Sequence, residues 1–112
     1  MHEAFKPING NFDQAARNSF KVNKSSCISW WLSASYAYYL RYESLLSDSA
    51  FDKMSKYILD NYESLEHNHK HLVTKEMLIA GSGYNLKEED YPLIVRVSTE
   101  EFVKLINLGI AP

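Results

Sequence analysis

Two carboxylates and a group of tyrosines have the types and the spacing that ligand binding requires. Asp48 and Asp52 are four residues apart, so on one helix they share a face and lie roughly 6 Å apart. Four tyrosines come shortly before them: Tyr36, Tyr38, Tyr39 and Tyr42. Tyrosine rings opposite two carboxylates form a slot that can stack a flat ring and hydrogen-bond a polyol or an amide.

A structural role accounts for several of the same residues. Asp48 can cap a helix that begins there, and Asp52 in the first turn of that helix interacts favourably with the helix dipole. The two roles are compatible, because free N–H groups at a helix N-terminus also hold polar ligands. Tyr36 and Tyr39 fall on an aromatic stripe at helical spacing, which favours packing in the core.

The aspartates and tyrosines lie where two expected helices meet. Residues 25–26 are serines that can cap a first helix, which ends near Glu43 and is apolar on most sides. Such a helix must be covered on most sides, so we expect it to be the central helix. Ser47 or Asp48 caps a second helix, which ends near Leu65.

The rest of the chain completes a small all-α fold. We expect residues 1–24 to be an irregular N-terminal arm with one or two helical turns, and residues 25–112 to be a single helical domain. Thr74 can cap a short helix. Residues 93–97 are rich in β-branched side chains, which predicts either a short strand or part of one helix over residues 91–108. We favour the helix, because a single strand needs a partner strand.

The corner between the first two helices resembles the short N-terminal domain of NAD-dependent DNA ligases, which binds the nicotinamide mononucleotide (NMN) half of NAD. That family has a Tyr-His pair at the end of one helix and Asp-x-x-Tyr-Asp at the start of the next. Laid on this chain without a gap, the motif falls on Tyr38, Tyr39, Asp48, Phe51 and Asp52. Tyr38, Asp48 and Asp52 agree with the family. Tyr39 replaces the His, and Phe51 replaces the second Tyr.

The resemblance covers roughly residues 26–72. The chain looks most like the short, free-standing ligase-related proteins of bacteriophages. It implies a site for NMN or NAD made of Tyr38, Tyr39, Asp48, Phe51 and Asp52. In such a site Tyr38 stacks against the cationic nicotinamide, a cation–π contact worth roughly 0.5–2 kcal/mol. Phe51 can stack but offers no hydroxyl, and Tyr39 cannot become a cation.

Three alternating histidines and a lone cysteine are further side chains with reactive chemistry. His67, His69 and His71 would share a face of an extended segment, as zinc ligands do, but short histidine tracts are more often solvated loops. We therefore expect no metal site. Cys27 has no second cysteine for a disulfide, so we expect it to pack in the core of a protein from a reducing compartment.

Length and charge narrow the classes of function. The 112 residues are the length of one small domain, and the net charge of −2 argues against a basic nucleic-acid-binding face. No run approaches the roughly 18 apolar residues of a membrane span, and the first residues lack the apolar stretch of a signal peptide. We therefore expect a cytoplasmic protein that contacts neither nucleic acid nor membrane directly.

The residues of ligase chemistry are missing from the sequence. It contains neither Lys-x-Asp-Gly, the motif of the nucleophilic lysine, nor a glycine-rich phosphate loop. We expect a non-catalytic module without a tightly bound cofactor, which recognises NMN or NAD or docks to a DNA-metabolism enzyme. The alternative is a phage-type interaction or inhibitor protein that binds a host factor. An enzyme acting on a pyridine nucleotide is least favoured, because no acid–base pair is identified.

Overall fold

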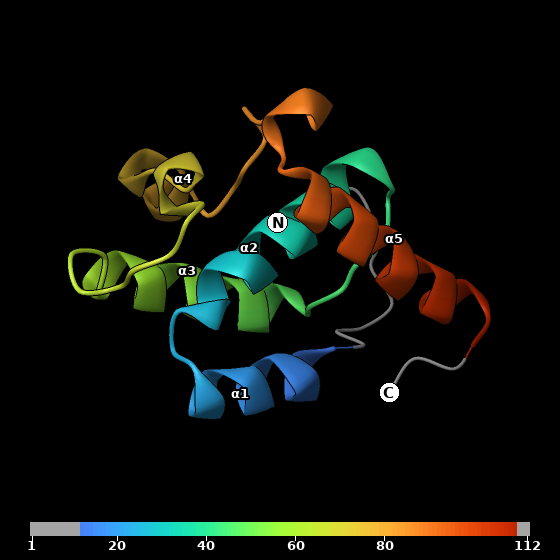
Figure 1. Cartoon of the computed structure of the whole chain (residues 1–112), viewed down its shortest axis with the longest axis horizontal. Helices are drawn as coiled ribbons and strands as arrows, with labels where there is room; N and C mark the ends of the chain where they lie inside the picture. The colour runs from blue at the N-terminus through green and yellow to red at the C-terminus, as the bar shows by residue number, and fades with distance from the viewer. Residues whose placement is uncertain (1–11, 110–112) are drawn as a thin grey trace.

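The most apolar helix of the chain forms the centre of the molecule. The computed structural model describes residues 12–109, and its α-helices are α1 (Asp13–Val22), α2 (Ser26–Leu40), α3 (Asp48–Asp60), α4 (Lys75–Ala80) and α5 (Leu93–Asn107). In Figure 1, α2 crosses the middle of the molecule, and it packs against α1, α3 and α5. Residues 31–38 are all buried, because a helix that is apolar all round needs neighbours on all sides. The predicted central position of this helix is confirmed.

Every regular element within residues 12–109 is helical, which confirms the all-α fold. α5 is unbroken, so residues 93–97 form its first turn and not a strand. Pro92 lies just before the first helical residue, a place that suits its fixed φ and its missing N–H. Single 3-10 turns, Lys70–Leu72 and Glu88–Asp90, lie on either side of α4 in the chain. None of the helices in this range combines the length and the hydropathy needed to cross a membrane.

Residues 13–22, which we expected within an irregular arm, form the regular helix α1. Phe12 precedes this helix, is buried, and donates its backbone N–H to the Leu45 carbonyl at 2.9 Å. Ala16 is buried one turn further along. Both residues belong to the main apolar core, so α1 is packed together with the rest of the fold. Residues 1–11 of the expected arm lie outside the described residues.

Of the two predicted caps, Ser47 or Asp48, it is Ser47 that caps α3, whereas Asp48 is the first residue of the helix. Ser47 also ties that helix to α1. Ser47 Oγ accepts the Ala50 N–H at 3.1 Å. The two carboxylate oxygens of Asp13 both accept from Ser47, one from its backbone N–H at 2.9 Å and the other from its hydroxyl at 2.7 Å. The first residue of α1 therefore helps to fix where α3 begins.

Two helices end earlier than their apolar patterns suggested. α2 ends at Leu40 rather than near Glu43, and α3 ends at Asp60 rather than near Leu65. Leu65 is nevertheless buried in the core from its position in the following loop. An apolar pattern therefore continues past the end of a helix when the loop also contributes to the core.

The short helix α4 has the predicted cap and is followed by a loop that reaches α2. Thr74 Oγ1 accepts the Met77 N–H at 3.2 Å, and Gly81 ends the helix with a φ of 67°, a conformation that favours glycine. Gly83 is buried against α2, where an added Cβ would lie 3.1 Å from the Trp31 ring and overlap the Ser35 hydroxyl. The close approach of this loop therefore requires a residue without a side chain.

Candidate functional site

The structure places the aromatic residues of the ligase-like motif in different surroundings. Phe51 is fully buried, and its ring stacks on Trp31 with the ring centres 5.3 Å apart. Tyr38 is only 5% exposed and meets the Tyr39 ring edge-on at 4.9 Å. The Tyr39 hydroxyl is hydrogen-bonded to the Ser82 hydroxyl at 2.6 Å. The fold thus brings Tyr38 and Tyr39 together but directs the Phe51 ring into the core.

The two aspartates of the motif share α3 but differ in exposure. Asp48 lies in the first turn, and its Oδ1 is buried without a hydrogen-bond partner among the described residues. Asp52 is exposed and lines a pocket between α3 and α4, together with Leu78 and Gly81. Neither Phe51 nor the two motif tyrosines line that pocket. The five residues therefore do not converge on it as one ligand slot.

A different pocket combines aromatic, hydroxyl and imidazole groups, and we call it the α2–α5 pocket. It has a volume of about 390 Å³ and lies between α2, α5 and the loop that follows α3. Its polar and aromatic lining consists of Ser29, Trp30, Ser33, His67, Asn68, His69, Ser98 and Phe102. The Trp30 and Phe102 rings stack with their centres 5.2 Å apart and their planes at 19°. No carboxylate, lysine or arginine occurs among its described lining residues, so any charge there must come from an imidazole.

The hydrogen bonds of His67 define its protonation. Its Nδ1 accepts the backbone N–H of His69 at 3.0 Å, and its Nε2 lies 2.8 Å from Ser29 Oγ. Because Nδ1 is an acceptor, the proton of the neutral imidazole sits on Nε2 and is donated to Ser29. Burial lowers the pKa of His67 below its usual value, and electrostatic repulsion from the neighbouring His69 lowers this pKa further.

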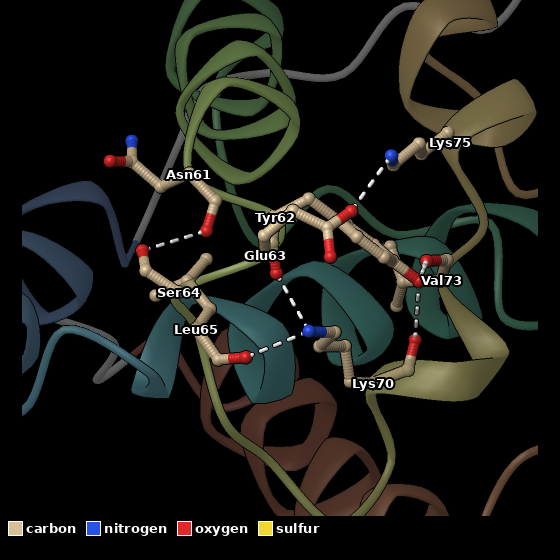
Figure 2. A network of polar contacts seen from close by, with 8 residues as sticks. All are labelled: Asn61, Tyr62, Glu63, Ser64, Leu65, Lys70, Val73 and Lys75. Atoms are coloured by element: carbon tan, nitrogen blue, oxygen red, sulfur yellow. Dashed lines mark hydrogen bonds and ion pairs between the residues drawn. The ribbon is translucent and has the colours of Figure 1, made fainter.

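A network of hydrogen bonds centred on Lys70 stabilises the loop that contains His67 (Figure 2). Lys70 Nζ donates to the Tyr62 carbonyl at 2.7 Å and to the Leu65 carbonyl at 2.9 Å. The Tyr62 hydroxyl donates to the Val73 carbonyl at 2.9 Å, and the Lys70 ammonium lies 4.6 Å from the centre of the Tyr62 ring. These hydrogen bonds run from the Lys70 and Tyr62 side chains to backbone carbonyls at both ends of the loop. They therefore help to hold the segment that contains His67 in place.

The histidine tract and the cysteine differ in what they contribute. No group of three or more His, Cys, Asp and Glu side chains within residues 12–109 is arranged to hold a metal ion. The rings of His67 and His69 lie 5.5 Å apart at the pocket, whereas His71 is exposed and does not line it. Cys27 is fully buried, as expected, and burial raises the pKa of its thiol to about 11. A thiol in that state is a poor nucleophile at neutral pH.

The sequence did not point to the α2–α5 pocket. Ser29 and His67 are 38 positions apart. Trp30 lies on α2, whereas Phe102 lies on α5 near the end of the described chain. The tyrosines and aspartates near the start of α3 predicted a ligand slot there instead. Helical spacing alone does not show which aromatic face stays partly open, because that depends on how α5 crosses α2.

Comparison with known proteins adds no family to this geometry. The chain matches no protein-family model, and it has no significant match among curated proteins or solved structures. The resemblance to NMN-binding domains therefore rests on the motif alone, in which Tyr38, Asp48 and Asp52 agree with the family. The function of the α2–α5 pocket has to be inferred from its own geometry and chemistry.

Proposed function

We propose that this chain is a non-catalytic binding module whose ligand occupies the α2–α5 pocket. The observation that carries the proposal is the pairing of a stacked aromatic wall, Trp30 and Phe102, with hydroxyl and imidazole groups in the same pocket. Small-molecule sites are typically pockets of roughly 300–1,000 Å³ with an apolar wall and a few convergent polar groups. The volume of about 390 Å³ falls within that range.

The Ser29–His67 pair supports binding rather than nucleophilic catalysis. A serine nucleophile needs an imidazole nitrogen that accepts its proton, and a third group that receives the N–H on the other side of the ring. Here Nδ1 accepts from the His69 backbone N–H, so the Nε2 proton is donated to Ser29. Ser29 is left with its own hydroxyl hydrogen as a donor, which suits recognition of a ligand oxygen.

The lining favours a ligand with a flat ring and a hydrogen-bonding edge. None of the five motif residues lines this pocket, so the choice of ligand rests on the lining itself. We propose that the pocket holds the pyridine ring of NMN or NAD, the ligand that the resemblance suggests for this chain, with its carboxamide facing the hydroxyls. An aromatic ring packed on Trp30 or Phe102 gains roughly 0.5–1.5 kcal/mol beyond its buried area. Without a lysine or arginine among the described lining residues, the nucleotide phosphate stays outside the pocket.

Thermal-shift titrations with NMN, NAD and nicotinamide separate this pocket from the motif residues. A ligand at about 100 times its Kd stabilises the fold by about 2.7 kcal/mol and raises Tm. Ser98→Phe fills the α2–α5 pocket from α5, whereas Asp52→Ala removes an exposed carboxylate of the motif. We expect the shift in the wild type and in Asp52→Ala, and its loss in Ser98→Phe, whose folding is checked by circular dichroism.

Two other results would count against this proposal. A shift that is lost in Asp52→Ala and kept in Ser98→Phe assigns the ligand to the ligase-like motif instead. The absence of a shift with all three ligands in every protein removes pyridine-nucleotide binding as the function and leaves protein interaction.

Protein interaction is the second candidate function, and an exposed apolar stripe on α5 favours it. Leu93, Ile94 and Val97 are 66%, 63% and 52% exposed, and they lie on adjacent turns of one helix face. Contiguous exposed apolar residues of this kind often mark a docking surface. The first partner to test is the adenylation domain of an NAD-dependent DNA ligase, as the resemblance suggests.

A pull-down with that purified adenylation domain tests the second candidate. We expect Val97→Lys to abolish capture, because a lysine in the centre of the stripe cannot be buried without a partner charge. Ile79→Lys is the matched control, since Ile79 is a 73% exposed apolar residue on α4. Equal capture by both variants, or none by the wild type, excludes the stripe as the docking surface for this partner.

A further inference from the structure

A second pocket lies on another side of the molecule, between α1 and α3, and we call it the α1–α3 pocket. It has a volume of about 360 Å³ and shares no lining residue with the α2–α5 pocket. In the view of Figure 1, α1 lies below α3 at the opposite side of α2 from α5. The apolar and aromatic lining of the α1–α3 pocket consists of Ala16, Phe20, Leu46, Ala50, Met54 and Tyr57. The two alanines let the helix backbones lie near the ligand, and the flexible methionine side chain can adjust to the shape of the ligand.

Positive charge accompanies this apolar lining. Arg17 on α1 and Lys53 on α3 both line the pocket and are exposed. Neither forms an ion pair with another described residue. The carboxylate in the lining, Asp13, is bound through both oxygens to Ser47. Arg17 donates to the Gln14 side-chain oxygen at 3.1 Å, and Asp13 keeps its negative charge. The pocket therefore offers an apolar interior and an excess of positive charge, from two cations that form no ion pair with a described residue.

We propose that the α1–α3 pocket binds an aliphatic monocarboxylate. The alkyl chain lies between the two helices, where each methylene that leaves water contributes to binding. The carboxylate pairs with Arg17 and Lys53, the former through the planar guanidinium that matches two carboxylate oxygens. This site is independent of the pocket that we propose for the pyridine ring, because the two pockets have no lining residue in common. They also differ in charge, since Arg17 and Lys53 line only the α1–α3 pocket.

Titration of 15N-labelled protein with decanoate, followed by amide resonances, tests the proposal. We expect saturable shifts at Ala16, Phe20, Ala50 and Met54, and no comparable shifts at Ser33 and Phe102 of the other pocket. Octanoate should bind up to about 15-fold more weakly than decanoate, because it buries two fewer methylenes. Decanol should bind about fivefold more weakly than decanoate, because it lacks the charge.

Two double variants with the same change in charge separate the site from a general effect of charge. Arg17→Gln with Lys53→Gln should weaken decanoate binding about fivefold, and the loss should shrink at high salt. Lys21→Gln with Lys56→Gln alters the same two helices outside the pocket and should leave the affinity within about twofold. All four side chains are exposed, so both proteins are expected to fold.

Several results would overturn the proposal. Equal affinities for decanoate and decanol would show that the cations do not recognise a carboxylate. Equal losses in the two double variants would show that only net charge matters. Binding to phosphatidylglycerol vesicles, or to an acidic amphipathic peptide, without any response to free decanoate would make this face a membrane or protein contact instead.

Discussion

At the scale of single residues, His67 decides what chemistry the α2–α5 pocket supports. Its two ring nitrogens are occupied by the His69 backbone N–H and by Ser29, an arrangement that the neutral imidazole satisfies. A proton on Nδ1 would face an N–H group and lose that hydrogen bond. Burial, and electrostatic repulsion from His69, also hold the pKa of His67 below its usual value. His67 therefore presents a neutral imidazole to the pocket at pH 7.

This protonation state predicts a loss of stability in acid. The folded protein binds the His67 proton less readily than the unfolded chain, in which the histidine pKa is about 6.5. The unfolded state therefore takes up more protons as the pH falls below that value, and the free energy of unfolding decreases. We predict that Tm falls between about pH 7.5 and pH 5.5, and that the fall is smaller in His67→Gln.

A matched histidine variant separates this effect from general acid sensitivity. His71 is exposed in the same loop and does not line the pocket, so His71→Gln should keep the pH dependence of the wild type. Thermal unfolding followed by circular dichroism over this pH range measures all three proteins. Identical slopes for His67→Gln and the wild type would show that His67 does not gain a proton on unfolding.

At the scale of elements, the start of α3 depends on a serine that serves two helices. Ser47 caps α3 through Ala50 and is held by both oxygens of Asp13 at the start of α1. We predict that Ser47→Ala lowers the free energy of unfolding by about 1–2 kcal/mol. Ser49→Ala is the control, since Ser49 is exposed in the first turn of α3 and should change stability by less than about 0.5 kcal/mol. Urea unfolding compares the two variants.

The loop between α4 and α5 depends on the missing side chain of Gly83. A methyl group there would overlap the Ser35 hydroxyl, which is itself hydrogen-bonded to the Tyr91 hydroxyl at 2.8 Å. We predict that Gly83→Ala destabilises the fold by about 1–3 kcal/mol, the usual cost of overpacking a buried site. Asn85→Ala, at an exposed position of the same loop, should be nearly neutral in the same chemical denaturation. A neutral Gly83→Ala would mean that the loop shifts without cost.

At the scale of the whole molecule, one core joins the first described residue to the last helix. Phe12 is buried, and its ring centre lies 4.8 Å from that of Phe102 on α5 and 6.2 Å from that of Trp30 on α2. We predict that Phe12→Ala costs about 3–5 kcal/mol, as for other buried phenylalanines. An irregular arm outside the core would instead make this substitution nearly neutral in equilibrium unfolding. Phe20→Ala, at a half-buried position, should cost less.

Local chemistry made several elements predictable from the sequence. The caps at Ser47 and Thr74 and the glycine at position 81 act on groups within a few residues of themselves, so their effect is visible in the sequence. The all-round apolar pattern of residues 26–40 likewise required a central helix. The helix over residues 13–22 was less clear, because its buried side is only a narrow stripe.

The sequence by itself determined that this is an all-α fold built around one central helix, because helix signals and caps are local. Only the tertiary structure decided which side of each helix faces the core. It buries the Phe51 ring against Trp31 and leaves Asp52 exposed, although both belong to one motif. It also brings His67 to Ser29. Contacts between residues so far apart in the chain depend on how the helices cross, which no local pattern records.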